Sequence, residues 1–153
     1  MLGSTDQTTI LKTLTSTLND SVNGYRDAAD NAEGSQFQQI FRDNASERER
    51  VAGELAGEVR RLGGTPDEDG TVLGKTHQAW LDLKAAVTGR DDKAIINEVE
   101  RGEDYLKEKF ETALASDKLS GESRTVVERA YQSVKSGHDQ FSQLKHGMEG
   151  TNA

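Results

Sequence analysis

The sequence predicts an all-α fold, a four-helix bundle of up-down-down-up order formed by one domain over residues 1–153. Three observations predict it. Apolar residues recur at spacings of three and four along the long segments, which is the pattern of a helix that packs on one side. The chain has one proline and only 5% aromatic residues, a composition poor in strand formers. Short stretches rich in glycine separate the periodic segments.

The first two helices are expected over residues 6–32 and 35–62. Gly34 can cap the end of the first helix, and the sequence GGTP at residues 63–66 is a strong stop for the second. Because the connection between the two helices is short, they should be antiparallel neighbours.

Three more helices are expected over residues 72–88, 92–115 and 121–146. Asp91 or Asp92 can cap the first of the two long ones. The chain before that cap is long enough to travel the length of the bundle, so the short helix should lie in the crossover between the second and third long helices. This crossover gives the up-down-down-up order.

The segments GGTPDEDGTVLGKTHQAWLDLK and NEVERGEDYLKEKFETAL carry a resemblance to a known family. Its sharpest elements are GGTP at residues 63–66, the pair His77-x-x-Trp80 and the run ERGED at residues 100–104. From about Ile10 to Leu144 the chain resembles a bacterial family of uncharacterised ferritin-like four-helix-bundle proteins, catalogued only as a domain of unknown function. The resemblance implies the ferritin-like arrangement and a bacterial cytosolic origin, and it implies no reaction.

Charge and composition exclude several classes of partner. Nineteen basic residues stand against 27 acidic ones, so the formal charge is −8 and nucleic acids and anionic membrane surfaces are not expected as partners. The chain has no cysteine, which excludes disulfides and thiolate chemistry. The start of the sequence lacks a basic and apolar leader pattern, and no apolar run is long enough to span a membrane, so we expect a cytoplasmic protein.

A dinuclear metal site in a ferritin-like bundle uses Glu-x-x-His pairs, because ligands three residues apart share one helix face. The residues three positions before the three histidines, His77, His138 and His146, are Gly74, Lys135 and Gln143. No such pair exists. Glu100-x-x-Glu103 has the right spacing, but each Glu follows an inward position and should face a flank of the core. The candidates left for a degenerate iron, manganese or zinc site are Glu47, Glu100, Glu103 and His138.

Arg48 favours a different use of these acids. It falls on the inward stripe of the second helix, where its guanidinium would repel a metal ion and could pair with Glu100 or Glu103. We therefore prefer a structural polar core of Arg48, Glu100 and Glu103 to a solvated acidic face or a metal site.

Gly102 and Gly137 both fall on inward stripes, which predicts that a bulky neighbour packs against each of them. The candidates for that neighbour are Tyr25, Tyr105, Tyr131 and Arg48. Trp80 should pin the crossover helix to the bundle, with its indole N–H near solvent or a carbonyl. A small-ligand pocket lined by Tyr25, Tyr131 and Trp80 is a further alternative.

No catalytic constellation stands out. The preferred function is therefore that of a non-enzymatic cytosolic helical bundle, related to stress, that acts through an unknown protein partner or through self-association as a homodimer. Ile10, Ile40 and Leu83 lie outside the main stripes and are candidates for that contact surface. The alternative is a degenerate ferritin-like metal-binding protein or oxidoreductase that uses a carboxylate and histidine site.

Overall fold

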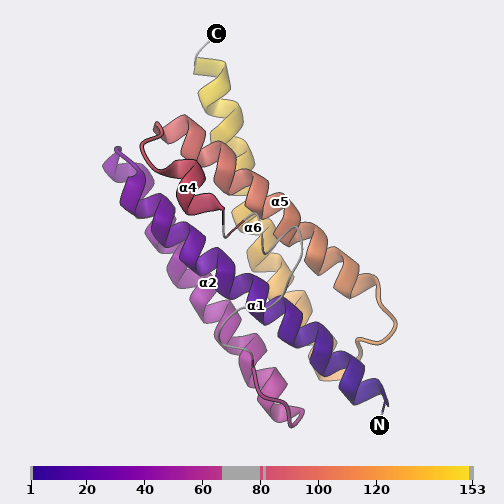
Figure 1. Ribbon diagram of the computed structural model, residues 1–153. Coiled ribbons are helices and arrows are strands. Elements are labelled where there is room, and N and C mark those ends of the chain that lie inside the picture. Colours follow the sequence, from indigo (N-terminus) through magenta and orange to yellow (C-terminus); the bar gives the residue numbers. More distant parts are fainter. Residues whose placement is uncertain (1, 67–79, 81, 152–153) are drawn as a thin grey trace.

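A computed structural model describes residues 2–66, 80 and 82–151, and every regular element in these residues is an α-helix (Figure 1). Four of the helices are long, which is compatible with the predicted bundle. None of the described helices is long and apolar enough to cross a membrane. The helices are α1 (Leu2–Asn31), α2 (Ser35–Arg61), α4 (Leu83–Val87), α5 (Asp92–Ala115) and α6 (Gly121–Thr151).

The observed helix ends differ from the predicted ones mainly at the two ends of the chain. The first helix begins at Leu2 rather than residue 6, and the last continues to Thr151 rather than ending at residue 146. Of the helix predicted over residues 72–88, the part at 72–79 and 81, which includes His77, lies outside the described residues.

Contacts at the two ends of α1 fix its direction relative to α5. Near the start of α1, the side-chain oxygen of Gln7 accepts a hydrogen bond at 2.9 Å from the backbone N–H of Ser120, just beyond the end of α5. At the other end, the backbone N–H groups of Glu33 and Gly34 donate to the carboxylate of Asp92, the first residue of α5, at 2.8 and 2.9 Å. Helices α1 and α5 are therefore antiparallel.

Contacts between α2 and α6 fix the remaining directions. Ser123, near the start of α6, donates to Glu58 near the end of α2 at 2.6 Å, and Asn44 donates to Gln140 at 3.1 Å. These two helices are antiparallel as well. Because α2 reverses the direction of α1, and α6 that of α5, helices α1 and α6 run one way and α2 and α5 the other.

Local sequence signals account for two of the helix ends. The Asp91 carboxylate accepts a hydrogen bond from the N–H of Ala94 at 2.9 Å, so Asp91 is the cap of α5 and Asp92 is free to hold the α1–α2 turn. At the end of α2, Gly63 adopts a φ of +88°, a left-handed conformation that glycine reaches without a steric penalty.

The buried side chains form two apolar clusters, one in each half of the bundle. The first cluster is built around Leu14, Leu55 and Phe110, and the second around Tyr25, Phe41 and Phe141. Along α2 the first cluster begins at Val51 and the second ends at Ala45. Arg48 lies between those two positions and is 1% exposed, so a charged layer separates the two apolar halves.

The Trp80 indole fills a slot between α1 and α5. It is 3% exposed, and a Cβ atom added to Gly102 of α5 would lie 2.9 Å from two of its ring carbons, while one added to Gly24 of α1 would overlap it. The neighbour of Gly102 is therefore Trp80, not one of the predicted side chains. Its Nε1 is buried and has no hydrogen-bond partner among the described residues, contrary to the prediction that it reaches solvent or a carbonyl.

Leu83 corrects the expected contact surface. It is 1% exposed and packs with Trp80 and Tyr25 in the second cluster, so it belongs to the core. Ile10 and Ile40 are partly buried against the two clusters.

We expect Gly102→Ala to lower the free energy of unfolding by up to about 2 kcal/mol. The helix-propensity gain of about 1 kcal/mol is outweighed by the clash with the indole, since overpacking typically costs about 1–3 kcal/mol. Gly53→Ala is the matched control, because Gly53 is an exposed helical glycine with open space around it, and it should gain up to about 1 kcal/mol. Urea denaturation measures both, and equal gains would rule out the packed slot.

Candidate functional site

A buried ion pair joins α2 to α5 in the charged layer. The Arg48 Nη2 donates to Glu103 Oε2 at 2.6 Å, and the two side chains are 1% and 0% exposed. The Tyr25 hydroxyl of α1 donates to the other carboxylate oxygen of Glu103. The Arg48 guanidinium also lies 5.4 Å from the centre of the Tyr25 ring, within the range of a cation–π interaction.

Helix α6 contributes a glycine, Gly137, to this layer. A Cβ atom added to Gly137 would lie 2.5 Å from the Arg48 Nη2 and 3.6 Å from Glu103 Oε2. Glycine at this position lets the guanidinium lie against the α6 backbone. Arg48, one of the side chains predicted to pack on an inward glycine, is therefore the neighbour of Gly137.

Electrostatics fix the protonation of the layer. Burial acts to lower the pKa of Arg48, but the charges and hydrogen bond of its neighbours, Glu103 first, outweigh it and hold that pKa above its ordinary value. Burial also raises the pKa of Tyr25 well above its ordinary value, and the adjacent Glu103 carboxylate raises it further. Near neutral pH, Arg48 is charged and Tyr25 is protonated.

The centre of the bundle is thus filled by a pair of opposite charges. One carboxylate oxygen of Glu103 accepts a hydrogen bond from Arg48 and the other accepts one from Tyr25. The guanidinium occupies the place that a metal ion at the centre would need. The sequence placed Glu103 on a flank of the core, but its exposure of 0% puts it in the interior.

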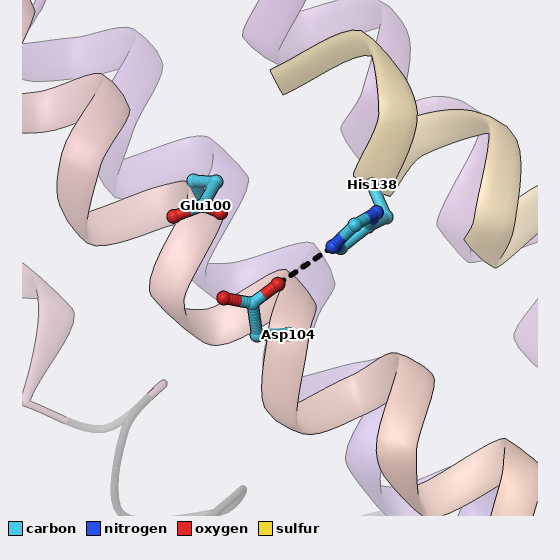
Figure 2. A group of neighbouring side chains, drawn as sticks. All are labelled: Glu100, Asp104 and His138. Carbon is cyan, nitrogen blue, oxygen red and sulfur yellow. Dashed lines mark hydrogen bonds and ion pairs between the residues drawn. The ribbon is translucent and has the colours of Figure 1, made fainter. Parts of the chain in front are cut away.

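A second group of ligand-type side chains lies on the flank between α5 and α6 (Figure 2). One ligand atom from each of Glu100, Asp104 and His138 lies within 4.8 Å of the others. Glu100 and Asp104 are four residues apart on α5 and share one face, and His138 reaches them from α6. The His138 Nε2 lies 2.6 Å from Asp104 Oδ1. The side chains of Glu100, Asp104 and His138 are 14%, 54% and 19% exposed, respectively.

The other nitrogen of His138 has its own partner. Its Nδ1 lies 3.2 Å from Asp139 Oδ1. The pKa of Asp139 is lowered, first by the hydrogen bond with His138 and then by that with Lys135. A carboxylate on the far nitrogen of an imidazole fixes the orientation of the ring, which is the usual outer support of a metal-binding histidine.

Glu100 takes no part in the predicted polar core. Its carboxylate lies 3.4 Å from the Nζ of Lys145 on α6, whereas Arg48 pairs with Glu103. The difference follows from helix geometry, since residues three apart are rotated by about 60° around the axis. Glu103 therefore points inward where Glu100 points to the flank.

Glu47 lies apart from the flank group. It accepts hydrogen bonds from Arg50 and, at 2.6 Å, from Ser133, and the hydrogen bond from Arg50 is the main reason that its pKa is lowered. The structure thus brings together Glu100 and His138 of the four sequence candidates and adds Asp104. The spacing of Glu100 and Asp104 indicates that they share one helix face, but the position of His138 on α6 was needed to select them as candidate ligands.

The three predicted pocket residues are divided between the two apolar clusters. Tyr25 and Trp80 pack directly on each other, with ring centres 5.7 Å apart. Tyr131 lies against the other apolar cluster and donates from its hydroxyl to Glu111 at 2.8 Å.

Comparison with known proteins places the chain in a family. The family described as Domain of unknown function (DUF2383) matches residues 6–116, most of the chain. The chain belongs to this family. No curated protein matches the chain. The DUF2383 match covers Arg48, Glu103 and both flank carboxylates, and it ends at Ser116, before His138. The ferritin-like relation, the bacterial origin and the cytoplasmic location remain predictions.

Removing one charge from the buried layer of this DUF2383 domain should lower the free energy of unfolding strongly. Glu103→Leu should cost about 3–5 kcal/mol, because it leaves a guanidinium buried without a partner. The triple variant Tyr25→Phe, Arg48→Met and Glu103→Leu should recover part of that loss, since no unpaired polar group then remains in the layer. Chemical denaturation compares them, and a triple variant less stable than Glu103→Leu would contradict the argument.

Alkaline pH should weaken the contribution of Tyr25. Its folded pKa is raised, so the stability that it adds is complete below the unfolded value of about 10 and is lost as the pH rises towards the folded value. The difference in unfolding free energy between the wild type and Tyr25→Phe should be constant up to about pH 9 and should shrink above about pH 10. A difference that widens above that pH would contradict the raised pKa.

Proposed function

We propose that this protein binds one divalent transition-metal ion, iron, manganese or zinc, on the flank of a ferritin-like bundle. The proposal rests on one observation, the convergence of Glu100, Asp104 and His138 from two helices. Two carboxylates and an imidazole suit these metals, and three protein ligands leave coordination positions open. Asp104 is the most exposed of the three, so the open side faces solvent.

The arrangement of the helices supports the ferritin-like part of the proposal. Helices α1 and α6 run opposite to α2 and α5, which is the direction pattern expected of an up-down-down-up bundle. The interior of this bundle is filled by Arg48 and Glu103, so the proposed ion lies outside the core.

The metal proposal replaces protein contact as the preferred function, because the structure supplies a specific group of side chains for it. The role of a protein-binding or self-associating bundle stays as the alternative. Among the described residues, no comparable group of side chains supports that alternative.

Calorimetric titration of the purified, tag-free protein with zinc should show about one site per chain. Asp139→Asn should weaken binding about tenfold, the usual effect of losing the outer partner of a metal-binding histidine, and Asp104→Asn should weaken it more. Glu108→Gln is the control, because it removes an exposed carboxylate one turn further along α5. Its affinity should equal that of the wild type.

Two results would overturn the proposal. One is the absence of stoichiometric zinc binding to folded protein, and the other is equal affinity in the wild type and in Asp104→Asn. Light scattering would then decide whether the alternative of self-association holds.

A further inference from the structure

We propose that Lys145 sets the metal affinity of the flank site by acting as an internal competitor for the metal. The inference rests on the proposed function. The ammonium of Lys145 lies 3.4 Å from Glu100 Oε2. A metal ion must therefore take this carboxylate from a cation that the protein already provides.

The register of the two antiparallel helices brings Lys145 to this position. His138 and Lys145 are seven residues apart, close to two helical turns, so they lie on one face of α6. Opposite them, Asp104 pairs with His138 and Glu100 with Lys145. Each carboxylate of the site thus has its own nitrogen partner across the helix interface.

The two partners differ in what they can do when a metal binds. The His138 Nε2 is itself a ligand atom, so it can exchange its contact with Asp104 for a contact with the metal. The Lys145 ammonium has no lone pair to give to a metal, so it repels the ion unless it moves away. Its side chain is 33% exposed, and the long stem gives it a path to water.

The remaining charges around the site do not replace Lys145. Lys135 pairs with Asp139 at 3.3 Å, on the far side of the imidazole. Among the described residues, Lys145 is the cation paired directly with a ligand carboxylate of this site. Its loss should free Glu100 for the metal and leave the other pairs in place.

Zinc titration of Lys145→Met tests the inference. Methionine keeps the apolar stem and removes the charge, so zinc should bind about tenfold more tightly than to the wild type, the scale expected for removing one charge beside a divalent ion in a solvent-exposed site. Lys145→Arg keeps the charge and should bind within about threefold of the wild type. Lys118→Met makes the same change in net charge beside Asp6 at the α1 start and should leave affinity unchanged.

Thermal melting gives a second readout. Without zinc, Lys145→Met should melt slightly below the wild type, because Glu100 has lost its partner, and saturating zinc should raise its Tm by more than it raises that of the wild type.

The outcomes separate the two proposals. Zinc binding by the wild type that is unchanged or weakened in Lys145→Met overturns the role of Lys145 and leaves the metal site standing. No binding by either protein overturns both. Tighter binding by Lys145→Met and Lys145→Arg alike would show that the charge is not the cause, and would also overturn the role.

Discussion

The buried ion pair between Arg48 and Glu103 is the interaction on which the rest of this structure depends. Taking two charges out of water is costly, and the cost is recovered only when the geometry satisfies both groups. Here both oxygens of Glu103 are satisfied, one by Arg48 and the other by Tyr25, and Gly137 leaves room for the guanidinium, whose Nη1 has no hydrogen-bond partner among the described residues. These four residues come from the four long helices. A slip of α1, α2 or α5 along its axis would leave a buried charge or hydroxyl without its partner, and a slip of α6 would put a side chain where Gly137 leaves room for the guanidinium. The layer therefore fixes the register of the whole bundle.

That register also decides how the acidic run at residues 100–104 is used. Successive helical residues are rotated by about 100°, so three acids within five residues cannot all face the same way. Glu103 points into the layer, while Glu100 and Asp104, about 40° apart around the axis, point together toward α6. The inward acid is satisfied by a permanent cation, and the outward pair meets a histidine and a lysine. A single turn of α5 therefore divides its carboxylates between structure and proposed binding.

The sequence predicted the helices better than their contacts. Apolar spacing and turn residues placed the long helices and left the cap of α5 to Asp91 or Asp92, because these signals are local. Register was less certain. Between Val99 and Leu106, both Gly102 and Glu103 keep the spacing of three and four and both are buried, whereas the apolar stripe drawn from the sequence included Gly102 and left Glu103 one position past it. The group of Glu100, Asp104 and His138 needed the register of α5 against α6, which no local signal contains. The Trp80 slot likewise combines α1 and α5 with a residue that belongs to neither helix.

Helix α6 links the interior and the flank through two neighbouring residues. Gly137 faces Arg48, and a Cβ atom there would press on the guanidinium that holds Glu103. The next residue, His138, is rotated by about 100° and faces the flank carboxylates. The residue at position 137 therefore determines how closely α6 approaches the Arg48–Glu103 pair, and the position of α6 in turn places the imidazole of His138. Arg48, whose charge excludes a metal ion from the centre of the bundle, thus also helps to position the ligands of the metal ion proposed at its edge.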